Sequence, residues 1–345
     1  MQLGKVPADT MTRQSQTWLA VLVVVAVFLS AWPVRHTFER LVANSRMHRP
    51  LSTVQTWRYQ LDHINVAQLA ADTSDLLVID YAKQQGKVPL TPQDVARIRY
   101  KPDGTRRFVV AYLSVGESEE FRYYWQAAWK ESPPVWVGEE NCAWPQAHRV
   151  RYWDEGWKQI NYRSSESYLR RIIDAGFDGV YLDRVDIYET FEKERPTARQ
   201  EMIAHVAELA ATARRIKPSF FVIPQNAEAL LDSAEYRDAI DGLGKESLLH
   251  GGTETGRRNP ERDIRWSSNM LRLLQDEGKP VFVVEYLVNA GQIDRTAAEL
   301  RRRNLVPAFE TRALDGQDPS TAINLETEIG TPERTTKECP PGTSW

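Results

Sequence analysis

The feature that most constrains the fold is an alternation, beginning near residue 51, of short apolar runs with longer amphipathic stretches. Several of the short runs are apolar almost throughout, as in LLVID, FVVAYL and VFVVEY. Strands with this pattern are buried on both faces, which is typical of a parallel sheet covered by helices. The sequence therefore predicts an α/β fold built from βα units.

The pattern predicts nine strands and eight helices. The strands are Thr56–Leu61, Leu76–Tyr81, Phe108–Leu113, Val150–Trp153, Gly179–Asp183, Phe220–Pro224, Ile240–Gly244, Val281–Tyr286 and Leu305–Phe309. The helices are Val66–Thr73, Pro92–Arg99, a region around Tyr123–Lys130, Ser165–Ala175, Thr197–Ile216, Ala227–Arg237, Pro260–Glu277 and Thr296–Arg303. An open, doubly wound sheet is the alternative, but no G-x-G-x-x-G follows the first strand and no Walker sequence occurs. We therefore predict a closed (β/α)8 TIM-like barrel, with one candidate strand too many.

A hydrophobic leader precedes the predicted barrel. Trp18–Trp32 (WLAVLVVVAVFLSAW) is apolar except for Ser30. A buried helix of the globular domain is disfavoured, because valine repeats without a polar face are rare in such helices. The run is short for a spanning helix and long for a signal-peptide core, so a cleaved signal and an uncleaved anchor both stay open. Either one predicts export, to a periplasmic or extracellular location or to the outer side of the cell membrane.

The domain organisation follows from these segments. Residues 1–17 are a cytoplasmic segment or signal n-region, residues 18–34 the signal peptide or membrane anchor, and residues 35–50 a linker. Residues 51–314 form the barrel. Residues 315–345 lack a sustained apolar period and form an extension that wraps the barrel or is partly disordered. The two cysteines, Cys142 and Cys339, would hold this extension if they pair in an oxidising compartment.

Charge and metal-ligand spacing disfavour two classes of function. Lys and Arg number 44 against 47 Asp and Glu, so there is no overall positive excess for a nucleic acid partner. The six histidines are scattered without an H-E-x-x-H motif, and the cysteines lack paired spacing, which disfavours a zinc hydrolase. A mechanism based on acid and base groups, with no metal and no cofactor, is the simpler prediction.

Carboxylates follow several predicted strands, at the end of a barrel where active sites lie. Asp80 ends LVID, Asp183 and Asp186 follow GVYL, and Glu246 follows the small residues of GLG. Helix capping explains Asp186 better than catalysis does. Asp183 and Glu246 stand two βα units apart, on the fifth and seventh predicted strands. Glycosidic hydrolysis requires such a pair, one acid to protonate the departing oxygen and one to stabilise the oxocarbenium-like transition state.

Aromatic residues are abundant in the loops that follow the strands. They are Tyr123, Tyr124, Trp125, Trp129, Trp136, Trp144, Tyr152, Trp153, Trp157, Tyr162 and Tyr188. Flat aromatic faces stack on sugar rings, although half or more of these side chains, Trp129 among them, are expected to pack helices against the barrel. Arg122, Gln225 and Asn226 add hydrogen-bonding groups that suit hydroxyl or acetamido groups. Together with the paired carboxylates, the aromatic residues favour a polysaccharide substrate.

Five ordered blocks carry a family resemblance. They are YLSVGESEEFRYYW (Tyr112–Trp125), VRYWDEGW (Val150–Trp157), GFDGVYLDRVDIY (Gly176–Tyr188), IPQNAEAL (Ile223–Leu230) and GLGKESLL (Gly242–Leu249). In this order they resemble glycoside hydrolase family 114, which contains endo-α-1,4-polygalactosaminidases and is similar to the hydrolase domains of Pel-type biofilm proteins. The resemblance covers the whole predicted barrel.

The resemblance implies cleavage of α-1,4-linked galactosamine or N-acetylgalactosamine polymers, with Asp183 and Glu246 as the catalytic acids. The predicted substrate contacts and their supports are Asp80, Tyr112, Glu117, Arg122, Trp153, Asp154, Asp186, Gln225, Asn226 and Tyr286. A galactosamine unit is cationic near neutral pH, so a cleft lined with carboxylates would attract it. Lys245 either points outward or weakens this attraction.

We predict an endo-acting glycosidase with Asp183 as nucleophile and Glu246 as acid/base, and retention and inversion both stay open. Two rival functions remain. One is a non-catalytic polysaccharide-binding barrel on the cell surface, because a barrel keeps its cleft when it loses its chemistry. The other is a metal-assisted hydrolase that uses Asp80, Asp183 and Asp186 and would lose activity with a chelator.

Overall fold

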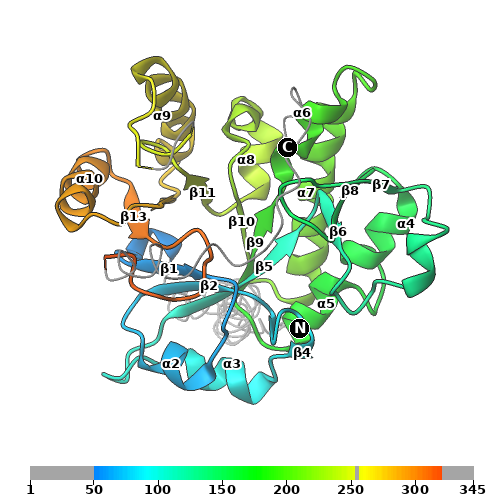
Figure 1. Cartoon of the computed structure of the whole chain (residues 1–345), viewed down its shortest axis with the longest axis horizontal. Coiled ribbons are helices and arrows are strands. Elements are labelled where there is room, and N and C mark those ends of the chain that lie inside the picture. Colours follow the sequence, from blue (N-terminus) through cyan, green and yellow to red (C-terminus); the bar gives the residue numbers. More distant parts are fainter. Residues whose placement is uncertain (1–49, 253–255, 321–345) are drawn as a thin grey trace, which may run out of the picture. The chain divides into compact units, whose positions relative to one another are not determined.

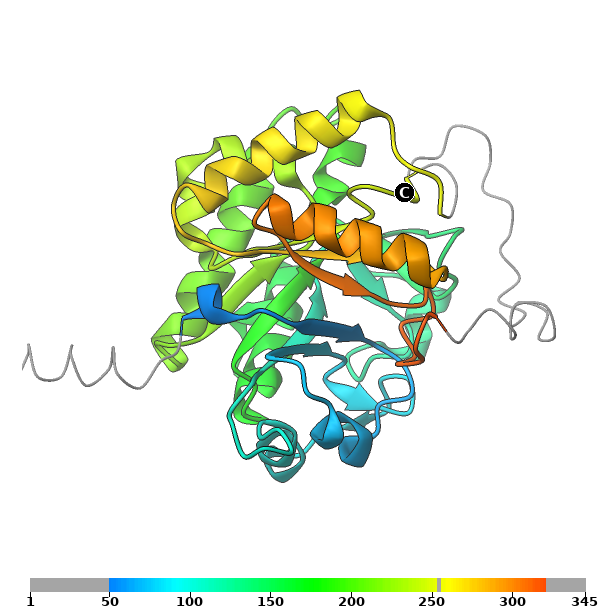
Figure 2. The ribbon, with the colours of Figure 1, turned by 90° about the vertical axis from the view of Figure 1, so that its left-hand side faces the viewer.

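A computed structural model describes residues 50–252 and 256–320 of the chain (Figures 1 and 2). Eight parallel strands in this part form the barrel: β1 (Trp57–Gln60), β2 (Leu76–Ile79), β5 (Phe108–Ser114), β9 (Gly179–Asp183), β10 (Phe221–Pro224), β11 (Leu243–Glu246), β12 (Val281–Glu285) and β13 (Val306–Phe309). The predicted (β/α) barrel is confirmed. The predicted leader and Cys339 lie outside the described residues, and within them no helix has the length and apolar character to cross a membrane.

The barrel is assembled from two sheets. Strands β1, β2, β5, β9 and β10 form one sheet in that order, and β11, β12 and β13 form the other. On one side the sheets meet at a parallel bridge between Gln225 and Gly244. On the other side, the Trp57 indole N–H donates to a main-chain carbonyl of β13, and the Tyr59 N–H donates to Glu310 Oε1 at 3.2 Å. A side-chain carboxylate therefore takes part in joining β13 to β1.

Seven helices cover the outside of the strands in the described part. They are α2 (Val66–Ala71), α3 (Pro92–Ile98), α5 (Tyr168–Asp174), α7 (Ala198–Ile216), α8 (Ala234–Ala239), α9 (Glu261–Gln275) and α10 (Ala290–Arg302). Capping residues in the local sequence determine where several of these helices begin. Thr91 and Asp94 form a reciprocal capping box at α3, and Asn65, Ser167 and Asn289 cap α2, α5 and α10.

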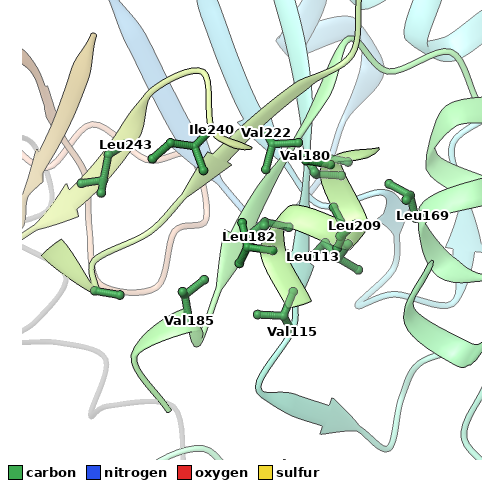
Figure 3. Packing of buried hydrophobic residues seen from close by; sticks show 14 of the residues in the cluster. Leu113, Val115, Leu169, Val180, Leu182, Val185, Leu209, Val222, Ile240 and Leu243 are labelled. Atoms are coloured by element: carbon green, nitrogen blue, oxygen red, sulfur yellow. The ribbon is translucent and has the colours of Figure 1, made fainter. Parts of the chain in front are cut away.

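Alternate residues of the strands face opposite sides, because the side-chain period of a strand is two residues. Leu113, Val180, Leu182 and Val222 face outward and pack against α5 and α7 (Figure 3). The inward-facing residues form a separate cluster, which includes Trp57, Tyr59, Val78, Val110, Tyr112, Tyr181, Ile223, Phe282, Val284 and Ala308. The barrel is thus a packed core, and the last inward residue of each strand faces the mouth.

The prediction of a strand at Val150–Trp153 was wrong for the barrel. Val150 ends β8 (Ala147–Val150), which pairs with β6 (Glu117–Glu119) and β7 (Val137–Glu140) in an antiparallel sheet within the long connection from β5 to α5. The residues that follow turn instead of extending, because the Asp154 carboxylate caps the short helix α4 (Glu155–Lys158). Asp183 and Glu246 consequently lie on the fourth and sixth barrel strands.

Three helix predictions also differ from the structure. The region around Tyr123–Lys130 contains only a 3-10 turn, η2 (Ala127–Lys130). The stretch Ala227–Arg237 is divided into η5 (Glu228–Asp232) and α8, because Ser233 adopts an extended conformation and caps α8. Helix α10 begins six residues before the predicted start, because Asn289 supplies a cap that the apolar pattern did not reveal.

Candidate active site

Asp183 is the last residue of β9 and faces the mouth of the barrel. Its Oδ2 accepts a hydrogen bond from the Tyr112 hydroxyl at 2.7 Å, and its Oδ1 accepts one from the Arg184 main-chain N–H at 2.7 Å. Burial raises the pKa of Asp183; the Arg184 guanidinium opposes the rise, and the negative charge of Glu246 adds to it. The Tyr112 and Arg184 donors thus hold both oxygens of Asp183 in a site that it shares electrostatically with Glu246.

Glu246 is the last residue of β11. Its Oε2 accepts hydrogen bonds from Gln225 Nε2 at 2.6 Å and from Asn226 Nδ2 at 3.3 Å. Its Oε1 accepts one from the Tyr286 hydroxyl. The two oxygens therefore differ, since two amides donate to Oε2, whereas the partner of Oε1 is a hydroxyl that can either donate or accept.

The floor of the site is made by Tyr59 and Tyr181 from the inner core of the barrel. Burial raises the pKa of both phenols well above the usual value, and the charges of Asp183 and Glu246 raise both further. The Tyr181 ring occupies the space that Gly244 leaves empty: a Cβ on Gly244 would lie 1.9 Å from the Tyr181 hydroxyl oxygen. Among the residues that the structure describes, the buried Tyr181 hydroxyl has no hydrogen-bond partner, so a polar group without a partner there lies beneath the two carboxylates.

Left-handed backbone conformations follow three of the barrel strands. Arg184, Asn226, Ala227 and Ser247 have φ values of 59°, 56°, 51° and 52°. Such values are uncommon for residues other than glycine and mark strained positions that the surrounding structure must stabilise. Each of these residues lies within three positions of the end of β9, β10 or β11, so strained backbone follows the strands that end at or beside Asp183, Gln225 and Glu246.

Arg122 is buried between two carboxylates. Its Nη1 lies 2.9 Å from the Asp80 carboxylate, its Nε lies 2.7 Å from Glu119 Oε2, and its guanidinium is 5.8 Å from the centroid of the Tyr112 ring. Asp80 also accepts the Ala82 N–H at 2.8 Å. Two predicted substrate contacts, Asp80 and Arg122, thus bind each other behind Tyr112, where they support the residue that donates to Asp183.

Glu117 and Asp186 both interact with Arg184, the residue that follows Asp183. Glu117 Oε1 is 3.0 Å from Arg184 Nε and accepts a hydrogen bond from Asn141 Nδ2 at 2.8 Å. Burial raises the pKa of Glu117 to about 7, with the Arg184 charge opposing the rise. Burial also raises the pKa of Asp186, again against Arg184. Arg184 therefore interacts with Glu117 and Asp186, and also with Asp183.

Trp153 and Asp154 have structural contacts elsewhere. Trp153 packs edge-to-face on Phe191 with ring centroids 4.9 Å apart, and the Arg195 guanidinium lies 4.5 Å from the Trp153 centroid. Asp154 Oδ1 accepts the Gly156 N–H at 2.8 Å as the cap of α4. These contacts account for both side chains without a bound sugar.

Lys245 points to the outer face of β11, where it is mostly covered and paired with a carboxylate. Its side chain is 17% exposed, and its Nζ lies 3.1 Å from Glu228 Oε1. Burial alone would raise the pKa of Glu228, but the Lys245 charge and a hydrogen bond from Ser267 hold this pKa below its usual value. Glu228 is therefore ionised and balances the charge of Lys245.

Sequence reasoning found most of the residues around the two carboxylates and missed four: Tyr59, Tyr181, Arg184 and Glu228. Tyr181 is the one of the four that carried a signal, which can be read from the period of the strand. Tyr181 precedes Asp183 by two residues and Gly244 precedes Glu246 by two, so the strand period places each pair on the inner face. Arg184 and Glu228 gave no signal of this kind, because each depends on a left-handed turn.

The fold is that of a (β/α) barrel, and the family to which the chain belongs makes it a glycoside hydrolase. The chain belongs to glycoside hydrolase family GH114, whose sequence model matches residues 39–326. An uncharacterised protein of Deinococcus radiodurans is 37% identical over 269 residues, covering 77% of this chain and 83% of the relative. An uncharacterised protein of Methanocaldococcus jannaschii is 32% identical over 269 residues, covering 75% and 72%.

A solved structure with a similar fold is the glycoside hydrolase domain of PelA from Pseudomonas aeruginosa. It superposes with a TM-score of 0.59 at 21% sequence identity, covering 76% of this chain and 96% of that domain. At this identity the similarity establishes the barrel fold.

Proposed function

We propose that the protein is an exported, endo-acting glycosidase that hydrolyses α-1,4-linked galactosamine or N-acetylgalactosamine polymers. The observation that carries the proposal is the placement of Asp183 and Glu246 at the ends of the fourth and sixth barrel strands, above a shared floor of Tyr59 and Tyr181. The sequence supports export through the apolar run at Trp18–Trp32.

The hydrogen bonds of the two carboxylates support a division of roles. Burial raises the pKa of Asp183, and the donors to both of its oxygens, from Tyr112 and Arg184, oppose this rise, as the charged carboxylate of a nucleophile requires. Glu246 receives two amide donors on Oε2, so its proton belongs on Oε1. There the Tyr286 hydroxyl can rotate and accept a hydrogen bond from the protonated oxygen. We therefore assign Asp183 as nucleophile and Glu246 as acid/base.

Charges around the cleft support an amino-sugar substrate. Six carboxylates surround the site, namely Asp80, Glu117, Glu119, Asp183, Asp186 and Glu246, and the cations Arg122 and Arg184 pair with them. Carboxylates outnumber cations there, so those that are ionised attract a protonated galactosamine unit, and the attraction is expected to weaken as salt increases.

The proposal is tested by reducing-end release from partially de-acetylated α-1,4-galactosaminogalactan. We expect the parent protein to release reducing ends, and Asp183→Asn and Glu246→Gln to lose at least about 10³-fold in kcat while circular dichroism shows the parent fold. With a 2,4-dinitrophenyl glycoside as substrate, whose leaving group needs no proton, azide is expected to rescue the nucleophile variant to a glycosyl azide of inverted configuration and the acid/base variant to one of retained configuration. Rescue in the opposite order would exchange the two roles.

The same assay separates the rival functions. Binding of the polymer without release would favour a surface-binding module. Loss of release after treatment with a chelator, with recovery on addition of a divalent metal, would favour a metal-assisted hydrolase built on Asp80, Asp183 and Asp186. Asp80 is already bound to Arg122 and to the Ala82 N–H, which favours the metal-free mechanism.

A further inference from the structure

Lys245 lies next to the proposed acid/base and takes part in a connected set of polar contacts. Ser267 on α9 donates to Glu228 Oε1 at 2.6 Å, and the same oxygen lies 3.1 Å from Lys245 Nζ. Lys245 Nζ in turn donates to Asn226 Oδ1 at 3.3 Å, and Asn226 donates to Glu246. The contacts run from a helix on the outside of the barrel to the carboxylate at its mouth.

The Asn226 carboxamide has a defined orientation because both of its ends are engaged. Its Oδ1 accepts hydrogen bonds from Lys245 Nζ and from the Glu246 main-chain N–H, the latter at 3.1 Å. Two donors on the oxygen require that the nitrogen face Glu246 Oε2. The left-handed backbone of Asn226, with φ of 56°, places the side chain between the ends of β10 and β11.

We infer that Lys245 is a positioning residue, which orients the Asn226 carboxamide and thereby keeps the catalytic proton on Oε1 of Glu246. The inference rests on the proposed function, because it assumes that Glu246 acts as the acid. With Asn226 donating to Oε2, a proton on that oxygen would face two N–H donors, so Oε1 is the oxygen that can carry it. Without Lys245 the Asn226 oxygen keeps one of its two donors, the Glu246 main-chain N–H, so the amide turns its oxygen toward Oε2 more often and the proton is then drawn to the wrong oxygen.

Lys245 has a second role in the structure, because it also neutralises the buried carboxylate of Glu228. The Glu228 carboxylate is buried, and Lys245 is the cation beside it. Removing Lys245 alone leaves a buried charge without its partner, which destabilises a protein for reasons unrelated to catalysis. The informative variant is therefore Lys245→Met combined with Glu228→Gln, because the uncharged glutamine can still accept from Ser267.

The test compares two substrates that differ in their need for an acid. Natural polymer has a poor leaving group and needs the Glu246 proton, whereas a 2,4-dinitrophenyl glycoside of a short galactosamine oligomer departs without it. We expect the double variant to lose about tenfold or more in kcat on the polymer, with KM little changed, and less than about threefold on the dinitrophenyl glycoside. Lys245→Arg keeps a cationic donor and is expected to restore most of the polymer activity.

Lys101→Met with Asp75→Asn is the matched control. Lys101 Nζ lies 2.6 Å from Asp75 Oδ1, its side chain is 12% exposed, and Asp75 precedes β2 at the opposite end of the barrel. This pair has similar burial and chemistry, so its removal is expected to lower Tm without changing the ratio of the two activities. An equal loss on both substrates in the Lys245 variant, or no loss on either, would overturn the inference.

A measurement without substrate keeps the inference separate from the proposed function. In NMR spectra the side-chain amide protons of Asn226, assigned with Asn226→Asp, are expected to exchange with water faster in the double variant than in the parent. If the parent released nothing from the polymer, the proposed function would fail. Unchanged exchange at Asn226 would refute the positioning role whatever the activity.

Discussion

Replacement of Gly244 by alanine is expected to damage the site through sterics alone. The new Cβ would lie 1.9 Å from the Tyr181 hydroxyl oxygen and 2.4 Å from Cζ, whereas ordinary contacts begin at 3.4 Å. Tyr181 is fully buried, so either its ring or strand β11 must retreat by about 1.5 Å within a closely packed core. Overpacking of this kind costs about 1–3 kcal/mol, which corresponds to a fall in Tm of about 2–12 °C for a domain of this size.

The effect on turnover is expected to exceed the effect on stability. Glu246 follows Gly244 by two residues on β11, and Asp183 follows Tyr181 by two on β9, so either displacement moves a catalytic carboxylate. A misplacement of about 1 Å costs about 10²-fold in rate, and we expect kcat/KM of Gly244→Ala to fall by that amount. The assay is reducing-end release with Tm measured by calorimetry.

A double-mutant cycle decides whether Tyr181 causes the loss. Leucine at position 181 ends before the atoms that clash, so Gly244→Ala is expected to cost less in the Tyr181→Leu background, with a coupling of about 0.5–3 kcal/mol. Gly291→Ala, in the first turn of α10 with its nearest contacts at 3.5 Å, is the control and is expected to keep activity and gain slightly in stability. A parent-like Tm and activity for Gly244→Ala would refute the reasoning.

Three further predictions concern the surroundings of the site. Arg122→Met leaves Asp80 and Glu119 as unpaired buried carboxylates and is expected to lower the free energy of unfolding by about 3–5 kcal/mol, measured with urea. Burial raises the pKa of Glu310 to about 8, so the folded state holds a proton that the unfolded state releases. Stability is therefore lost as pH rises from about 4.5 to 8. Glu310→Gln is expected to remove this loss, and its Tm is expected to exceed that of the parent at about pH 8 but not at about pH 4.5. Tyr286→Phe removes the hydroxyl beside the acid/base and is expected to lower kcat about 10–10²-fold with KM little changed in steady-state assays.

The fold could be predicted because its determinants are local and periodic. Apolar runs such as FVVAYL and VFVVEY show strands buried on both faces, and helix-forming stretches separate them. The stretch Val150–Trp153 is also rich in β-branched and aromatic residues, but it contains the end of an antiparallel strand and the turn that precedes the capped helix α4. Composition alone does not distinguish a barrel strand from a strand in a connecting segment, because both favour β-branched and aromatic residues.

The site could be predicted where carboxylates or amides end a strand, as at Asp183, Gln225 and Glu246. It could not be predicted where a side chain is held by a residue distant in sequence. Trp153 resembles a sugar-stacking residue in sequence, yet it packs on Phe191, which no local pattern indicates. Whether an aromatic side chain faces a ligand or the core depends on tertiary packing, and a single sequence does not contain that information directly.

The two carboxylates lie on different sheets, Asp183 in the five-stranded sheet and Glu246 in the three-stranded one. Their separation is therefore set at the joints between the sheets, one of which is the bridge between Gln225 and Gly244. A small shear of one sheet against the other would change the gap between the acids while the hydrogen bonds inside each sheet stay intact. Since a gap of about 5–5.5 Å suits a covalent intermediate and one of about 6.5–9.5 Å admits a water molecule, these joints are where stereochemical outcome could be redesigned with few substitutions.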